Sequence, residues 1–153
     1  MDIPDALKAI AAQYDAHDFV DGDCHTLAVA LYEAHGLQGS LLACMRKTLN
    51  EDGSVYSTGY SHMVYECPQG RIWDIGGDNA DIRWEESFPD IDVPDKWGMT
   101  SAFEWVAIPY EGHQAWLMEH HGCIDNLLGN YLKQTIRATQ APEKPQGASA
   151  LSM

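Results

Sequence analysis

The spacing of apolar residues changes from a helical to a strand pattern at the glycines at positions 36 and 39, and this change limits the possible fold classes. Before it, Leu7, Ile10 and Tyr14 recur three or four residues apart, which is the period of one helix face. The run CHTLAVALYEAHG has the same period and ends at a glycine, a residue suited to ending a helix. The sequence therefore predicts helices over residues 4–16 and 24–36.

After residue 39 the chain is rich in β-branched and aromatic residues, which favour strands. Four runs predict strands: SLLACMRKTL (40–49), SVYSTGYSHMVYEC (54–67), RIWDIG (71–76) and FEWVAIPY (103–110). NEDG and PQG are the turns between the first three of them. HQAWLMEHH and CIDNLLGNYLKQTIRAT predict one or two further helices, and residues 77–99 predict a long irregular loop.

This order of elements, helices then a mostly antiparallel sheet then helices, predicts an α+β fold. A chain of 153 residues has the size of one domain with one core. We expect a single domain over residues 1–139. Residues 140–153 are rich in Pro, Ala and Ser, and we expect them to form a disordered tail.

The charge of the chain excludes some partners. Its 23 acidic and nine basic residues give a formal net charge of -14, which disfavours nucleic acids and anionic membranes and permits a basic protein partner. The N-terminal residues have neither the basic nor the apolar region of a signal peptide, and no stretch is long enough to be a membrane helix. We therefore expect a cytoplasmic protein.

The four cysteines, at positions 24, 44, 67 and 123, have no CxxC spacing, so we expect reduced thiols and no metal or cofactor. Cys24 opens the predicted helix over residues 24–36, with Asp23 as the expected N-cap. Unpaired N–H groups and the helix dipole favour a thiolate at that position. The same N–H groups can hold the oxyanion that forms when a thiolate attacks a carbonyl.

A general base for this thiol is predicted on the neighbouring strands. If the PQG turn pairs HMVYEC with RIWDIG in a hairpin centred on Gln69, then His62 and Asp74 are diagonal neighbours on one face of the sheet. This predicts Cys24 as nucleophile, His62 as base and later acid, and Asp74 as the group that fixes the imidazole tautomer.

The runs GDCHTLAVALYEAHGL, SHMVYEC and GRIWDIGG together resemble the core of papain-like cysteine enzymes, over about residues 20–78. The similarity is greatest to the transglutaminase-like branch, which includes bacterial cysteine peptidases and arylamine N-acetyltransferases. The resemblance implies a nucleophile-bearing helix packed on the sheet. It also implies a hydrolase or acyl transferase acting on a peptide, amide or thioester, with thiol protease or amidase action as the first expectation.

The chain departs from the papain-like pattern in one respect that bears on catalysis. Where such enzymes often carry an oxyanion-hole Gln or Asn before the cysteine, this chain has His17, Asp18 and Asp21. An alternative is therefore a non-catalytic acidic binding module on the same fold that engages a basic protein.

Three further histidines have weaker interpretations. His25 points away from the thiol on the predicted helix, so we expect a surface or supporting role for it. A metal site at His120, His121 and Cys123 is a minor alternative, because the spacing is not that of ligands on one helix face.

Overall fold

A computed structural model describes residues 3–16, 18–21, 23–78, 94, 96–122 and 124–140. The helices are α1 (Ile3–Gln13), α2 (Asp18–Asp21), α3 (Cys24–Ala34), α5 (His113–His120) and α6 (Asn126–Gln140). The strands are β1 (Ser40–Leu49), β2 (Val55–Glu66), β3 (Ile72–Asp74), β4 (Gly77–Asp78) and β5 (Thr100–Ile108).

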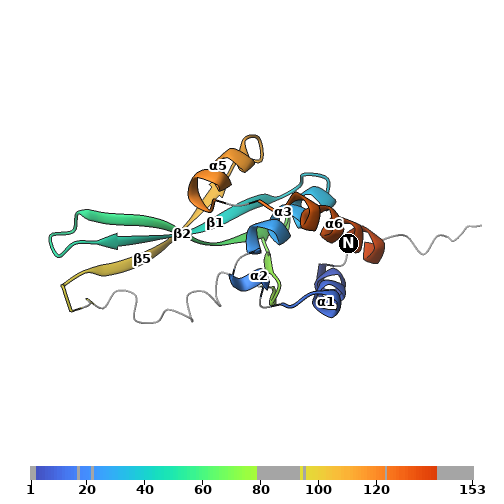
Figure 1. The fold of residues 1–153 in the computed structure, drawn as a ribbon, viewed down its shortest axis with the longest axis horizontal. Coiled ribbons are helices and arrows are strands. Elements are labelled where there is room, and N and C mark those ends of the chain that lie inside the picture. Colours follow the sequence, from blue (N-terminus) through green and yellow to red (C-terminus); the bar gives the residue numbers. More distant parts are fainter. Residues whose placement is uncertain are drawn as a thin grey trace, which may run out of the picture.

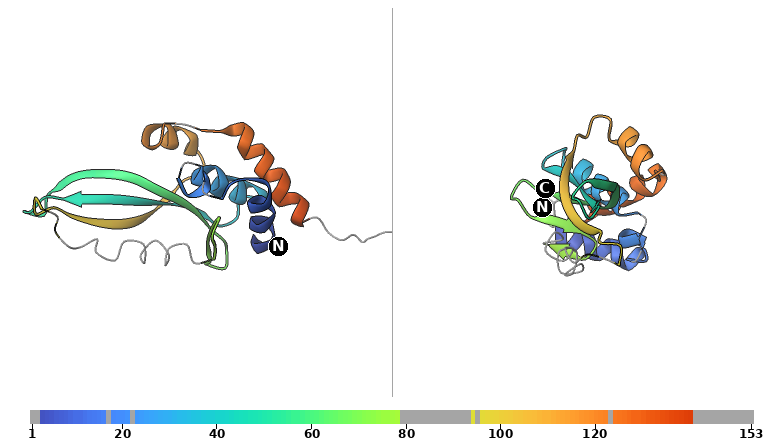
Figure 2. Two further views of the ribbon diagram at one scale, coloured as in Figure 1. Left: turned by 60° about the horizontal axis from the view of Figure 1, so that its bottom comes forward. Right: turned by 90° about the vertical axis from the view of Figure 1, so that its left-hand side faces the viewer.

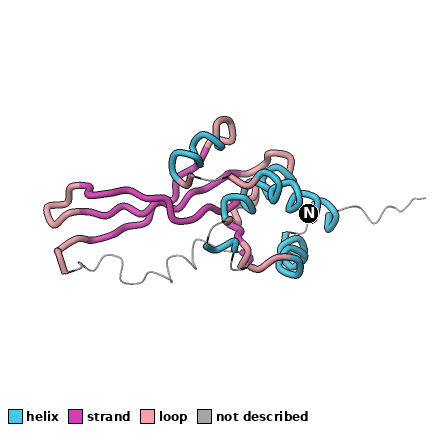
Figure 3. Tube along the Cα trace, in the orientation of Figure 1, coloured by secondary structure: helices cyan, strands magenta, loops and turns pink. Residues whose placement is uncertain are grey.

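The five strands form one antiparallel sheet in the order β4-β3-β2-β1-β5, so the predicted α+β class is confirmed. β1, β2 and β5 run together well beyond the other elements, and α1, α2, α3 and α6 gather at one end of them (Figure 1). The same extension is seen when the molecule is viewed from a second direction (Figure 2). Colouring by secondary structure shows that the three strands continue along its length (Figure 3). One half of the sheet is therefore packed against the helices, and the other half projects away from them.

Burial along β2 follows this division. Its first five residues, Val55 to Gly59, are exposed, whereas the four residues from His62 to Tyr65 are buried. Because successive residues of a strand face opposite sides of the sheet, both faces of β2 are exposed in the projecting half and both are covered near the helices. The covered half of β2 is thus the part that can supply buried functional groups.

α3 lies between two groups of packed side chains. Leu27, Ala30 and Leu31 belong to the first group, with residues of α1, α6 and the β2–β3 hairpin. Cys24 and Ala28 belong to the second group, with residues of β1, β2 and α5. Because α3 is apolar on two sides, it is the central helix of the domain, and Cys24 is placed against the sheet.

Two glycines define the passage from α3 to β1. Gly36 has a φ of 71° and is the predicted residue that ends the helix, with its N–H bonded to the carbonyl of Glu33. Gly39 has a φ of 101°, and a Cβ there would lie 2.2 Å from the carbonyl oxygen of Glu66. Glycine is therefore required at position 39 both for backbone conformation and for the close approach of β2.

Several predicted elements differ from the structure. The segment 18–21, between the first two predicted helices, forms the short helix α2, and the expected loop at 77–99 begins with strand β4. The fourth strand was predicted over 103–110 but spans Thr100–Ile108, because β1 provides a partner for each of these residues. The expected tail was 140–153, but Gln140 is the last residue of α6; residues 141–153, like 79–93 and 95, lie outside the described residues. No helix among the described residues is long and apolar enough to cross a bilayer.

Candidate active site

The structure places Cys24 at the first residue of α3, as predicted, with 5% of its surface exposed. Asp23 occupies the N-cap position, but its side chain makes no capping hydrogen bond, which differs from expectation. The N–H groups of the first turn are therefore not engaged by that side chain. They lie beside the thiol, where they can interact with negative charge.

His62 and Asp74 are brought together by the β2–β3 hairpin. Tyr65 pairs with Trp73 and Glu66 with Ile72, which is the predicted register. His62 Nε2 lies 3.3 Å from Asp74 Oδ2, and both residues are buried. The other oxygen of Asp74 accepts a hydrogen bond from the Gly76 N–H at 2.8 Å, so the carboxylate is held on two sides.

The thiol and the imidazole have shifted pKa values in opposite directions. Burial alone would raise the pKa of Cys24, but hydrogen bonding with His25, His62 and Tyr60 and the charge of His62 lower it to about 5. Burial alone would lower the pKa of His62, but hydrogen bonding with Asp74 and Cys24 and the charges of both raise it to about 9. At neutral pH these values correspond to a thiolate and an imidazolium.

The tautomer of His62 follows from the same geometry. Its Nε2 faces Asp74, so that nitrogen carries a proton in both the neutral and the charged ring. Nδ1 is then the nitrogen that can gain and lose a proton. Asp74 thus occupies the position of an orienting group and Nδ1 that of a base.

Cys44 provides an internal comparison for Cys24. It lies in β1 opposite His62 and is fully buried, yet burial raises its pKa to about 11. Cys44 therefore remains a neutral thiol, whereas Cys24 does not. The difference arises from the polar neighbours of Cys24, since both thiols are buried.

Two neighbours of the thiol were not anticipated from the sequence. Tyr60 Oη lies 3.2 Å from Cys24 Sγ. His25 is 1% exposed, so of its two expected roles the surface one is wrong and the supporting one stays a prediction. Its ring lies 4.4 Å from that of His121, and its Nε2 lies 3.3 Å from Thr26 Oγ1. His25 follows Cys24 directly in the sequence, which is the one signal that pointed to it.

The remaining sequence candidates do not join this group. Asp18 is exposed, and His17 and the side chain of Asp21 lie outside the described residues. Cys123 of the alternative metal site also lies outside them. Within the described part of the chain, no group of three His, Cys, Asp or Glu side chains could hold a metal ion.

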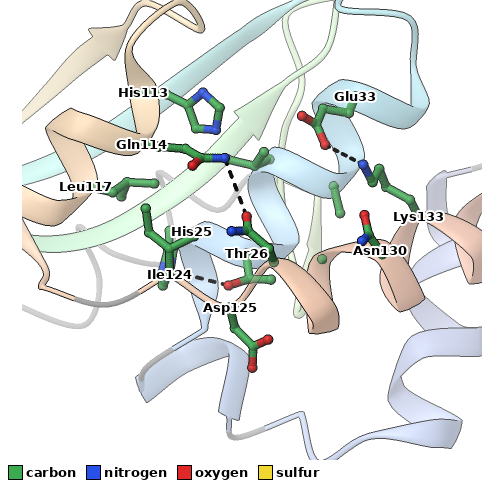
Figure 4. Close-up of a pocket in the computed structure, with 14 residues that line it drawn as sticks. His25, Thr26, Glu33, His113, Gln114, Leu117, Ile124, Asp125, Asn130 and Lys133 are labelled. Atoms are coloured by element: carbon green, nitrogen blue, oxygen red, sulfur yellow. Dashed lines mark hydrogen bonds and ion pairs between the residues drawn. The ribbon is translucent and has the colours of Figure 1, made fainter.

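A pocket of about 320 Å³ lies between α3, α5 and α6, and His25 and Thr26 form part of its wall (Figure 4). Its lining is mostly polar, and at its far end Lys133 Nζ lies 2.9 Å from a carboxylate oxygen of Glu33. Cys24 does not line this pocket. His25 therefore separates the pocket from the thiol and contacts both.

Comparisons of this chain with models of protein families, with curated proteins and with solved structures found no match.

Proposed function

We propose that this protein is a cysteine-dependent hydrolase or acyl transferase, of the papain-like kind that the sequence resembles, with protease or amidase action as the leading form. The observation that carries the proposal is a buried thiol at the first residue of α3 together with a buried His62–Asp74 pair, whose Nε2 and Oδ2 atoms lie 3.3 Å apart. The pKa of the thiol is lowered and that of the imidazole is raised, which agrees with this geometry. Structural cysteines in apolar surroundings have raised pKa values, as Cys44 does. The opposite shift is typical of activated nucleophiles.

In the proposed reaction, Cys24 Sγ attacks the carbonyl carbon of an amide or thioester, and the carbonyl π electrons move to oxygen. N–H groups of the first turn of α3 stabilise that oxyanion. When the carbon–oxygen double bond re-forms, the leaving group departs and takes a proton from His62 Nδ1, as an amine from an amide or as a thiol from a thioester. An acyl group is then held on sulfur as a thioester.

The second half of the reaction returns the enzyme to its first state. Neutral His62 removes a proton from water, or from an acceptor amine in a transferase, as that nucleophile attacks the thioester. Sγ leaves as a thiolate and the imidazolium is restored. Asp74 remains ionised throughout and keeps Nε2 protonated and oriented.

Selective alkylation tests this proposal. Iodoacetamide, followed by mass spectrometry of each cysteine-containing peptide, should modify Cys24 much faster than Cys44, Cys67 or Cys123 in the native protein. Cys67 is the matched control, since its exposed fraction is 6% against 5% for Cys24. Equal labelling of all four thiols would contradict an activated nucleophile at Cys24.

Two observations favour the alternative, an acidic binding module without catalysis. The net charge is -14, and the Cys24 thiol is only 5% exposed. This alternative predicts an inert Cys24, together with binding of a cationic probe such as cytochrome c that persists in Cys24→Ala and weakens steeply with salt. Binding that is indifferent to salt would count against it.

A further inference from the structure

The hydroxyl of Tyr60 faces the sulfur of the proposed nucleophile, with Oη 3.2 Å from Cys24 Sγ. We propose that this hydroxyl is an oxyanion-hole donor, which takes the place of the Gln or Asn side chain absent before Cys24. The inference rests on the proposed function and adds to it a catalytic residue and a requirement for a carbonyl substrate.

Tyr60 lies beside an irregularity in the sheet. Cys44 of β1 pairs with His62, but the next residue, Met45, pairs with Tyr60, so Ser61 is an additional residue in β2. A β-bulge of this kind changes the direction of nearby side chains and is frequent beside active sites. Tyr60 and His62 flank this bulge, and both interact with the thiol at the start of α3.

Aromatic neighbours hold the Tyr60 ring in place. The ring of Trp116, from α5, lies 5.8 Å away at an interplanar angle of 82°. The ring of His121 lies 5.6 Å away at 75°. Both are edge-to-face contacts, the arrangement that aromatic pairs prefer. A donor fixed before the reaction stabilises a developing charge without reorganisation, which is what an oxyanion hole requires.

The hydroxyl is a donor at neutral pH. Burial, and after it the charge of Cys24, raise the pKa of Tyr60 above its ordinary value, so the phenol keeps its proton. A carboxylate such as Asp18 or Asp21 would repel an oxyanion, whereas a neutral phenol attracts it. Tyr60 therefore has the charge state that the acidic residues before Cys24 do not provide.

The chemistry transfers negative charge from sulfur to oxygen. As the bond between Sγ and the carbonyl carbon forms, the π electron pair of the carbonyl moves to its oxygen, which is two bonds from Sγ. A hydroxyl that donated to the thiolate can donate to this neighbouring oxyanion after a small shift. The phenolic proton stays on Tyr60, and the hydrogen bond is released when the carbonyl re-forms.

Two reagents that differ in their transition states separate this role from simple support of the thiol. Iodoacetamide alkylates sulfur by displacing iodide, with no oxyanion. p-Nitrophenyl acetate acylates sulfur through a tetrahedral oxyanion. In Tyr60→Phe at pH 7 we expect acetylation of Cys24, followed by mass spectrometry, to fall about 10²- to 10³-fold. Alkylation should change less than about threefold.

Tyr56→Phe is the matched control, because Tyr56 lies in the same strand and is 63% exposed. It should change neither rate. Thermal unfolding of Tyr60→Phe verifies that the variant is folded.

Each contrary outcome has a distinct meaning. If Tyr60→Phe lowers both rates equally, Tyr60 supports the thiol and is not an oxyanion donor. If it changes neither, the hydroxyl has no part in the reaction. If the unmodified protein reacts at Cys24 with neither reagent, the proposed function itself fails and the inference fails with it.

Discussion

The Cys24–His62 pair should make folding stability depend on pH in one narrow interval. In the folded protein the pKa of Cys24 is about 5 and that of His62 about 9, against ordinary values of 9.0 and 6.5. Between pH 5 and 6.5 the unfolded chain therefore holds a proton on each group, while the folded pair holds only one. Stability rises with pH wherever the unfolded state binds more protons.

The sign differs for the two groups. The lowered thiol pKa gives stability that is lost as pH falls through about 5, and the raised imidazole pKa gives stability that is lost as pH rises through about 9. From pH 6.5 to 9 the two changes cancel, because each state binds one proton. The interval from pH 5 to 6.5 spans about 1.5 pH units, and each unit adds about 1.4 kcal/mol, so the free energy of unfolding should rise by about 2 kcal/mol.

Urea unfolding at several pH values, in the unmodified protein and in Cys24→Ser, measures this rise. In Cys24→Ser, His62 keeps Asp74 as its partner and stays protonated over this interval, so the rise should vanish. Cys44→Ser is the control and should keep it, since Cys44 remains a neutral thiol. In thermal unfolding the same difference corresponds to about 4–8 °C in Tm. A stability difference between the unmodified protein and Cys24→Ser that is constant from pH 5 to 6.5 would refute the ion pair.

Two other substitutions follow from contacts of the site and of the fold. Asp74→Asn removes the carboxylate that raises the pKa of His62. Acylation of Cys24 should therefore slow by about 10²- to 10⁴-fold, and the alkaline limb of its pH profile should move below about 9. An unchanged alkaline limb would show that Asp74 does not control the pKa of the imidazole. Gly39→Ala places a Cβ against the Glu66 carbonyl at a φ of 101° and should lower the free energy of unfolding by more than about 1 kcal/mol in urea. Gly59→Ala has open space and is its control, so equal losses in the two variants would contradict the steric argument.

The local sequence pattern was sufficient to predict the elements that carry the three predicted site residues. The period of the apolar residues and the glycine at 36 predicted α3, which carries Cys24. The neighbouring strand β1 spans the predicted residues 40–49. The short PQG turn fixed the register of β2 against β3, and with it the approach of His62 to Asp74. Those features depend on residues close together in the sequence, which is why they could be predicted.

Tyr60 and His25 could not be predicted in the same way. Tyr60 lies two residues before His62 in β2, but its contact with the thiol depends on how α3 packs on the sheet, and the local run STGYSHM indicates neither that packing nor the bulge between the two residues. His25 is buried because His121, about a hundred residues later, packs on its ring. α2 and β4 are too short, at four and two residues, for any periodicity to appear.

The central claim is the thiolate–imidazolium pair, and the most direct test is the rate of Cys24 alkylation as a function of pH in the unmodified protein and in His62→Ala. The account predicts that the rate in the unmodified protein rises with an apparent pKa near 5, well below the ~8.5 of a free thiol, and that His62→Ala moves it toward the free value. A rate that rises only near the free value in both proteins, or a Cys24 that does not react, would contradict it.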